Sequence, residues 1–289
     1  MLRAFQTTMR PKIALDLGHS EIRIAILGKE NSTLPFPSYQ IRNVRLLTEF
    51  IKKHLGYWLR LRPDLYFLVD PCDSHERQLS VRDIGTALGA HRVYRILRPL
   101  AHVKSLNTVP WGTVLVDIGA EAVVISTIQE GSVLQCHEIQ SGGKALDQHL
   151  IQYLRRNYYL NISLQTAENM KKSTSPAHLI SAIQSQTGVP VRALIYQEEL
   201  MDAWQPVLQS WTEAIQQSLY QSSYKLVECL KVEGIFITGG GALLNGLNEY
   251  LASALNISVT RLQAPLQSAL IGAEHWMNGI KLPECLKKY

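Results

Sequence analysis

The sequence has few cysteines and no long apolar run, and each shortage narrows the class of protein. Its four cysteines are scattered along the 289 residues, and none stands in a C-x-x-C pair. Single cysteines are typical of reduced, structural thiols in a cytosolic protein, and not of a disulfide framework. No apolar run reaches the ~20 residues that a membrane span needs, and the N-terminus lacks the apolar region of a signal peptide. We therefore expect a cytoplasmic protein.

Charged residues are also sparse, at 18% of the chain against 46% hydrophobic residues, which allows one large bilobal unit or two ordinary domains. The formal net charge is +5, but the basic residues are dispersed, as Arg45, Lys52 and Lys53 are along one predicted helix. Solvated helix faces explain this distribution, and anionic lipid and acidic partners are the alternatives. We find no zinc-finger spacing and no helix-turn-helix pattern, so we expect no nucleic-acid partner.

Two segments about a hundred residues apart repeat one plan. Residues 13–26 and residues 114–125 each consist of a buried strand, an Asp-x-Gly turn and a second apolar strand. A carboxylate at the end of a buried apolar strand is costly without a use, so Asp16 and Asp117 are candidates for lining a cleft. A repeat of hairpins predicts two similar half-domains that face each other. Carboxylates on opposing hairpins can hold a hydrated Mg²⁺ against phosphates gripped by backbone amides.

A run of three glycines, Gly239, Gly240 and Gly241, follows the apolar residues 234–237 and precedes a helical pattern that starts at Leu247. A glycine-rich turn from strand to helix lets backbone N–H groups approach a ligand that any Cβ would exclude. That geometry is typical of a nucleotide pocket, whereas a tight crossover is the structural alternative. The two hairpins favour the pocket, in which the glycine turn would close the nucleoside end.

Strand and helix patterns alternate along the first part of the chain. Residues 44–54 and 80–88 have helical periodicity, and residues 65–69 and 93–97 have the composition of buried strands. Alternating β and α elements imply a largely parallel sheet packed between helices. The turn-rich residues 107–112 are the predicted crossing into a second lobe.

These elements, in this order, resemble the actin, Hsp70 and sugar-kinase superfamily, and the sequence motifs are most similar to those of the bacterial actin MreB family. Residues 142–147 look like the family's Gly-Gly-Asp segment, and residues 153–158 are similar to its Tyr-Val-Arg-Arg-Asn-Tyr helix. Residues 166–171 are similar to its Thr-Ala-Glu-x-x-Lys. The resemblance covers nearly the whole chain, and residues 117–143 match the family's spacing without a gap.

The resemblance implies an α/β protein with a shortened, two-lobed actin-like ATPase fold made of duplicated ribonuclease-H-like domains. Residues 10–108 with 266–289 would form the first lobe, and residues 109–265 the second, with a reduced outer subdomain around 160–205. In the first lobe only residues 28–43 remain where the family has a small outer subdomain, which is too few for a packed unit.

The resemblance also implies ATP and Mg²⁺ as cofactors, with Asp16 and Asp117 holding the metal through water. The nucleotide-binding residues that it implies are Asp16, Gly18, Asp117, Gly119, Gly142, Gly143, Glu168, Lys171, Gly239, Gly240 and Gly241.

Two departures from the family concern hydrolysis. Where the family has Glu-Glu-Pro, whose second glutamate positions the hydrolytic water, this chain has Leu97-Arg98-Pro99. A guanidinium cannot accept a proton from water, so we expect no catalytic residue there and a degenerate ATPase activity. The second hairpin has Ala120 and Glu121 where the family has two glycines, which narrows the approach to phosphate and adds a negative charge.

Two functions remain open at this point. The first is that of a nucleotide-binding cytoskeletal protein that maintains rod shape together with MreB-like subunits or other morphogenesis proteins. The second is that of a monomeric actin-like ATPase that serves as a reactivating chaperone or assembly factor, which the missing outer subdomain favours. Met1, Leu2, Phe5 and Met9 fall on one side of a predicted N-terminal helix. That segment either binds the inner membrane surface weakly or is a frayed terminus.

Overall fold

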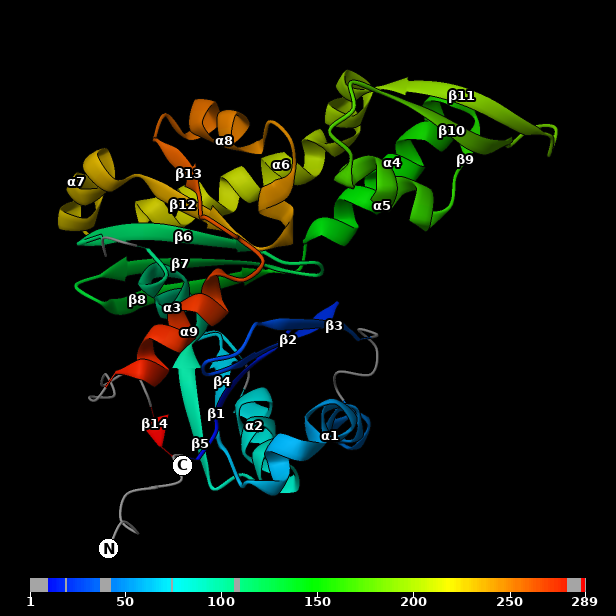
Figure 1. The fold of residues 1–289 in the computed structure, drawn as a ribbon. Helices are drawn as coiled ribbons and strands as arrows, with labels where there is room; N and C mark the ends of the chain where they lie inside the picture. Colours follow the sequence, from blue (N-terminus) through cyan, green and yellow to red (C-terminus); the bar gives the residue numbers. More distant parts are fainter. Residues whose placement is uncertain are drawn as a thin grey trace, which may run out of the picture. The chain divides into compact units, whose positions relative to one another are not determined.

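The structure is a computed structural model in which the chain forms two units, each built around its own sheet (Figure 1). Unit 1 comprises residues 1–110, 130–136 and 266–289, and unit 2 comprises residues 111–129 and 137–265. The residues that the structure describes are 10–18, 20–36, 43–73, 75–106, 110–279 and 287–288.

The sheet of unit 1 has the strand order β14-β5-β4-β1-β2-β3. The central strand β1 pairs in parallel with β4, which pairs in parallel with β5, and β1, β2 and β3 form an antiparallel meander. The strands are β1 (Lys12–Leu17), β2 (Glu21–Ile26), β3 (Ser32–Pro35), β4 (Asp64–Val69), β5 (Arg92–Leu97) and β14 (Lys287–Lys288). The helices are α1 (Val44–Arg60), α2 (His75–Ala87), α3 (Arg98–Lys104) and α9 (Ser268–Asn278).

Both faces of this sheet are buried, as the apolar character of its central strands requires. Successive side chains of a strand point to opposite faces, so Ile13 and Leu15 pack with α1 and α2, whereas Ala14 packs with α3 and α9. Helix α9 crosses α3 so closely that a Cβ on Gly272 would lie 1.7 Å from the carbonyl oxygen of Ala101. Only glycine fits at this crossing. The C-terminal helix therefore belongs to the core of unit 1.

The second sheet has the order β13-β12-β6-β7-β8, which repeats the order β5-β4-β1-β2-β3 of the first. In both sheets the Asp-x-Gly hairpin is the antiparallel pair at the centre, and the next two strands on the other side run parallel to it. The strands are β6 (Gly112–Ile118), β7 (Val123–Gln129), β8 (Ser132–Ile139), β12 (Ile235–Thr238) and β13 (Val259–Arg261). Residues 132–136 of β8 fall in unit 1 in the division given above. The prediction of a repeated hairpin in an α/β fold is confirmed. That the two hairpins face each other stays a prediction.

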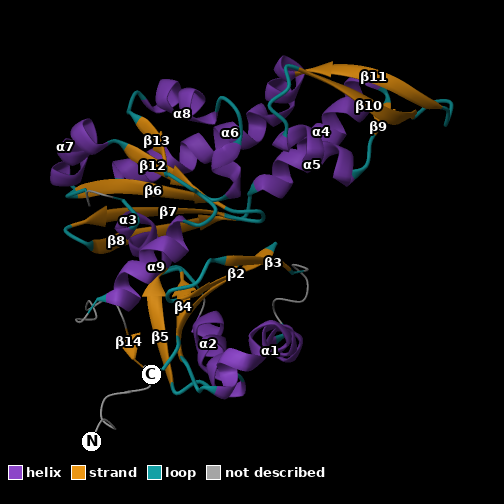
Figure 2. Cartoon of the chain, in the orientation of Figure 1, coloured by secondary structure: helices purple, strands orange, loops and turns teal. Residues whose placement is uncertain are grey.

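The helices of unit 2 bury an apolar core against its sheet (Figure 2). The long helix α6 contributes two almost fully buried tryptophans, Trp204 and Trp211. The helices are α4 (Gly143–Tyr158), α5 (Leu164–Lys172), α6 (Gln197–Tyr220), α7 (Tyr224–Glu233) and α8 (Leu247–Leu255), and the 3-10 helix η2 spans Gly240–Leu243.

Unit 2 carries a small additional sheet, and the described residues of unit 1 form none at the corresponding place. Between α4 and α6 the strands β9 (Leu160–Asn161), β10 (Ala177–Gln184) and β11 (Pro190–Tyr196) form a three-stranded antiparallel sheet. The matching connection of unit 1, from β3 to α1, consists of residues 36–43 only. The difference follows from chain length, because eight residues cannot form a packed unit.

The cysteines and the helices bear on two further predictions from the sequence. Cys72, Cys136 and Cys229 form no disulfide in the described part of the chain. No described helix is long and apolar enough to cross a membrane. The predicted N-terminal amphipathic helix, residues 1–9, lies outside the described residues, as does part of the crossing at 107–112.

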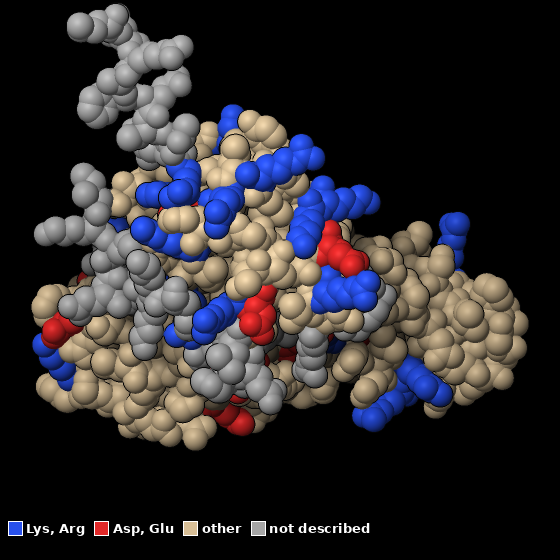
Figure 3. All heavy atoms as spheres, turned by 90° about the horizontal axis from the view of Figure 1, so that it is seen from below, with Lys and Arg blue, Asp and Glu red and all other residues tan. Residues whose placement is uncertain are grey.

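The basic residues are spread as the sequence analysis expected. Arg45, Lys52 and Lys53 are exposed on α1. Lys and Arg stand in several separate groups on the face drawn in Figure 3, with other residues between them.

Candidate functional site

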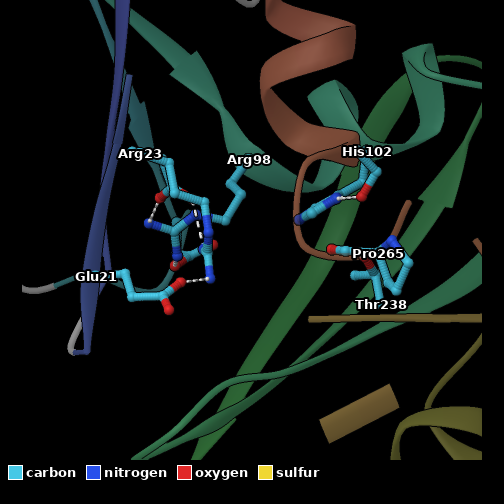
Figure 4. Close-up of polar contacts among 9 residues, drawn as sticks. Glu21, Arg23, Arg98, His102, Thr238 and Pro265 are labelled. Atoms are coloured by element: carbon cyan, nitrogen blue, oxygen red, sulfur yellow. Dashed lines mark hydrogen bonds and ion pairs between the residues drawn. The ribbon is translucent and has the colours of Figure 1, made fainter. Parts of the chain in front are cut away.

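The first candidate residue, Asp16, lies near the end of β1 and is almost completely buried. Its direct cross-strand partner on β2 is Arg23. Arg23 donates a hydrogen bond from Nη1 to Asp16 Oδ2 over 3.2 Å and one from Nη2 to Glu21 Oε2 over 3.0 Å (Figure 4). One oxygen of the Asp16 carboxylate is therefore already occupied by a guanidinium within its own hairpin.

A second arginine reaches the other oxygen of Asp16. Parallel strands end at the same edge of a sheet, so the residues after β4 and β5 come close to the end of β1. Arg98 Nη2 lies 3.0 Å from Asp16 Oδ1, which makes an ion pair without the angles of a hydrogen bond. Arg98 Nη1 donates to Oδ2 of Asp70, the residue that follows β4. The side chains of both aspartates are 7% exposed, and that of Arg98 is 16% exposed.

Asp16, Asp70, Arg23 and Arg98 form what we call the arginine cluster. Each carboxylate in it has a guanidinium partner, the four formal charges sum to zero, and Arg23 also pairs with Glu21 outside the cluster. Arg98 stands where the resemblance given in the sequence analysis implies a water-orienting carboxylate, and its guanidinium is engaged with two buried carboxylates. A guanidinium in this position cannot serve as a general base.

The cluster does not fit a Mg²⁺ ion at Asp16. Mg²⁺ needs oxygen ligands or hydrogen-bonded water around it in octahedral geometry, and both oxygens of Asp16 face guanidinium nitrogens instead. Across the described residues, no group of three or more His, Cys, Asp or Glu is arranged to hold a metal ion. The predicted metal role of Asp16 therefore has no support in the side-chain geometry.

The second candidate residue, Asp117, lies near the end of β6 in unit 2, opposite Thr238 of the parallel strand β12. The glycines that follow β12 pack directly on it. A Cβ on Gly239, whose φ is +80°, would lie 2.4 Å from Asp117 Oδ1, and one on Gly241 would lie 2.0 Å from Cγ2 of Ile118. Close packing within unit 2 therefore requires glycine at both positions, so their lack of a side chain does not by itself indicate a ligand.

The Asp-x-Gly hairpin of unit 2 is also bonded to the start of α4. The amides of Gly142, Gly143 and Lys144 donate to the carbonyl oxygens of Glu121, Gly119 and Ala120 over 2.8–2.9 Å. These three amides already have acceptors within unit 2. Gly142 and Gly143 can therefore border a ligand because they lack a side chain, and not by donating hydrogen bonds to it.

Lys144 Nζ lies 2.8 Å from Glu121 Oε1, so the negative charge of Glu121 is balanced by a neighbouring cation. This pairing reduces the repulsion of a polyanion that the sequence predicts for Glu121. The sequence does not reveal Lys144 as the partner of Glu121, because the two residues are 23 positions apart.

Helix α5 places the two remaining candidates differently. Lys171 Nζ donates to Asp147 Oδ2 over 2.6 Å and to the carbonyl oxygen of Gly143 over 2.8 Å, which ties α5 to the first turns of α4. Burial raises the pKa of Asp147, while the hydrogen bond from Lys171 acts in the opposite direction. Glu168 instead pairs with Lys172 over 2.7 Å on the helix surface, and this hydrogen bond lowers the pKa of Glu168.

The predicted residues thus fall into two sets. Asp16 and Gly18 lie in unit 1, at the first hairpin. The set in unit 2 comprises Asp117, Gly119, Gly142, Gly143, Glu168, Lys171, Gly239, Gly240 and Gly241. Within it the two hairpin residues, the two α4 glycines, Lys171 and Gly239 are joined by the contacts above, and Glu168 is not.

Sequence reasoning missed Asp70, Arg23 and Asp147. Asp70 follows a buried apolar strand, as Asp16 does, so the signal that identified Asp16 could have identified it. Asp147 stands within the Gly-Gly-Lys-Ala-Leu-Asp stretch, but its role depends on a lysine 24 residues away, which the spacing does not reveal.

Two units with the same strand order, each with an Asp-x-Gly hairpin at its centre, define the actin-like ATPase class of folds. The family model described as MreB/Mbl protein matches residues 42–284, and the chain belongs to this family.

Individual relatives agree with this assignment. The cell shape-determining protein MreB of Escherichia coli is 27% identical over 234 residues, which cover 77% of this chain and 67% of that protein. Among solved structures, MreB5 of Spiroplasma citri bound to ADP superimposes with a TM-score of 0.84 at 17% identity, over 93% of this chain and 99% of that one. The MamK double helical filament has a TM-score of 0.75 at 17% identity, over 94% of this chain and all of that one.

Proposed function

We propose that this chain is a nucleotide-binding cytoskeletal protein that takes part in determining cell shape. The observation that carries the proposal is the duplicated hairpin, in which Asp16 and Asp117 occupy the same place in two sheets of identical order. The name of the Escherichia coli relative supports the cell-shape role. The ADP and AMPPNP in the MreB5 structures support an adenine nucleotide as the ligand.

The nucleotide contacts that we propose follow the resemblance. Gly239, Gly240 and Gly241 border the ribose and α-phosphate, and Lys171 lies on the side of the sugar and base. The bond from Lys171 to the carbonyl oxygen of Gly143 supports its inclusion, because it holds the ammonium beside the α4 glycines. Glu168 is the weaker candidate, since its carboxylate is paired with Lys172.

We also propose that hydrolysis of ATP is far slower than in family members that keep the Glu-Glu-Pro sequence. Losing a general base typically lowers the rate by about 10²–10⁴-fold. The engagement of Arg98 with Asp16 and Asp70 supports this, because a guanidinium held by two carboxylates cannot orient a water as a carboxylate does.

Self-association with like subunits is part of the proposal, and the MamK filament among the structural relatives supports it. The short connection from β3 to α1 favours the alternative, a monomeric ATPase that acts as an assembly factor. Sedimentation of the purified protein with and without nucleotide separates the two. Pelleting polymers support the cytoskeletal role, and a strictly monomeric species at all concentrations contradicts it.

Calorimetric titration with ATP or ADP tests the binding step. We expect Gly240→Val to abolish affinity, because a β-branched side chain would occupy the space of the ligand. Gly56→Val is the matched control, since Gly56 lies on the exposed face of α1, where an added Cβ would have no atom within 4 Å. Unchanged affinity in Gly240→Val would show that Gly240 does not line the nucleotide pocket.

Single-turnover release of phosphate tests the hydrolysis step. A rate comparable to that of an active MreB, lost in Asp117→Ala, would contradict the proposal. Restoration of activity by Arg98→Glu would support it, but that change places a third carboxylate beside Asp16 and Asp70. The variant is therefore combined with Asp70→Asn, which removes one of the two neighbouring charges.

A further inference from the structure

We propose that this protein binds its nucleoside polyphosphate without a divalent cation, because the arginine cluster already neutralises the carboxylate of Asp16 that would hold the cation. The inference rests on the proposed nucleotide binding. It gives Arg98 a role of its own, which is to neutralise a buried carboxylate, in addition to the absence of a catalytic base at this position.

The first step concerns the coordination of Asp16. A hydrated Mg²⁺ is held at a carboxylate when the carboxylate oxygens accept hydrogen bonds from the metal-bound water. Here Oδ2 accepts from Arg23 over 3.2 Å, and Oδ1 lies 3.0 Å from a nitrogen of Arg98. A water on a metal ion would have to displace one of these two guanidinium groups.

The second step concerns what displacement would require. The Asp16 and Asp70 side chains are each 7% exposed, so removing Arg98 from them would leave two carboxylates buried without their partner. An uncompensated buried charge is strongly unfavourable, whereas the paired state is tolerated. The cluster therefore excludes the metal by occupying its ligand.

The third step concerns the polyphosphate. In a site with a bare aspartate, a cation must neutralise the carboxylate before phosphates can approach it. In this chain the two guanidinium groups already balance Asp16 and Asp70, and Arg23 also pairs with Glu21, so these carboxylates have cationic partners without a metal ion. Arginine suits this task, because its planar fork binds two carboxylates at once and keeps its charge at any physiological pH.

The fourth step concerns how the fold positions Arg98. Arg98 is the first residue of α3 and follows β5 directly, and Pro99 fixes the start of the helix. Its backbone is held by the sheet edge, so the guanidinium is positioned by rigid elements and not by a loop. The cluster is thus a built feature of unit 1.

The test is a calorimetric titration of the full chain with ATP in two buffers, one with excess Mg²⁺ and one with EDTA. We expect dissociation constants that agree within about twofold. Binding that appears only with Mg²⁺, or is more than about tenfold tighter with it, overturns this inference and leaves the proposed function standing. Absence of binding in both buffers overturns both.

Two variants locate the effect at Arg98. We expect Arg98→Gln to bind at least about tenfold more tightly with Mg²⁺ than with EDTA, because the second oxygen of Asp16 becomes accessible. Arg98→Lys keeps the cation and should stay independent of Mg²⁺. Arg45→Gln, which removes an exposed arginine from an i,i+4 pair on α1, is the matched control and should behave as the unaltered protein does. Equal affinities in both buffers for Arg98→Gln would overturn the role of Arg98, and circular dichroism of each variant verifies that it is folded.

Discussion

The two central hairpins of this protein occupy the same place in two sheets of the same order, but their surroundings differ in kind. Around Asp16, the positions at the sheet edge are filled by the charged side chains of Arg98 and Asp70. Around Asp117, the corresponding edge carries Gly239 and Gly241, whose backbone packs on the hairpin. Unit 1 has ion pairs at this edge, and unit 2 has the backbone of two glycines.

The difference teaches that one topology supports two environments for an aspartate at the end of a central strand, a buried one for Asp16 and a half-buried one for Asp117. In unit 1 the charge is neutralised by arginines from neighbouring elements. In unit 2 a backbone turn lies against Asp117, and the ion pair of Lys171 with Asp147 joins two helices. Electrostatic changes should therefore act most strongly in unit 1, and changes of side-chain volume should act most strongly in unit 2.

The largest effect is expected for Arg98→Ala. Removing one partner of a buried ion pair costs about 3–5 kcal/mol, because the remaining carboxylates stay buried without compensation. Chemical denaturation should show a loss of this size in the free energy of unfolding. A double variant, Arg98→Met with Asp70→Asn, should lose clearly less, since it removes charge of both signs. Equal losses in the two variants would mean that the cluster contributes through packing and not through charge.

A smaller loss is expected for Gly239→Ala in unit 2. Its φ of +80° and ψ of 177° are nearly restricted to glycine, and a Cβ would clash with Asp117 Oδ1 at 2.4 Å. Together these terms should lower the free energy of unfolding by about 3 kcal/mol. Gly246→Ala is the control, because its φ of +77° is also positive but no atom lies within 4 Å. It should lose only about 1 kcal/mol, and a similar loss at both sites would contradict the crowding around Asp117.

The third effect concerns pH and the buried pair of unit 2. Burial raises the pKa of Asp147 above its ordinary value of 3.8, so the folded protein holds this proton more firmly than the unfolded chain does. The stability contributed by this group is therefore fully present below pH 3.8 and falls as the pH rises through the folded pKa. The free energy of unfolding relative to Asp147→Asn, measured from about pH 3 upward, should decrease in that window. An increase would mean that the ion pair with Lys171 outweighs burial.

The smallest effect is expected for Lys144→Ala. The Lys144 side chain is 42% exposed and that of Glu121 33%, so solvent screens their ion pair. Such pairs contribute about 0.5 kcal/mol or less. The matched change Lys171→Ala, at a side chain that is 17% exposed, should cost several times more by the same denaturation measurement. If Lys144→Ala were the more harmful of the two, the pairing at the second hairpin would have a structural role that its exposure does not suggest.

Much of the fold could be predicted from the sequence because its signals are local. The strand and helix patterns of residues 44–54, 65–69 and 93–97 reappear as α1, β4 and β5, and α1 extends further, to Arg60. Both Asp-x-Gly hairpins were identified from apolar runs interrupted by a turn, a pattern that depends on neighbouring residues only. The beginning of α2 at His75 was missed, since its first turn has no apolar periodicity.

The candidate site was less predictable, because its contacts join residues far apart in the chain. The sequence predicts that Arg98 matters as a missing base, but its two carboxylate partners lie 82 and 28 positions earlier, at the ends of other strands. The sequence predicts that the glycines at 239 and 241 allow a ligand to approach, and in the structure atoms of Asp117 and Ile118 exclude a Cβ at these positions.

The sequence by itself determined the class of fold, the repeat of the two hairpins and the identity of the residues at their tips, since periodicity and turn chemistry act within a few positions. Only the tertiary structure decided how each tip aspartate is balanced. Parallel strands bring the residues after β4 and β5 to Asp16, and those after β12 to Asp117, and the order of strands in a sheet is not written in the spacing of residues along the chain. The same Asp-x-Gly signal thus ends beside arginines in one unit and beside glycines in the other.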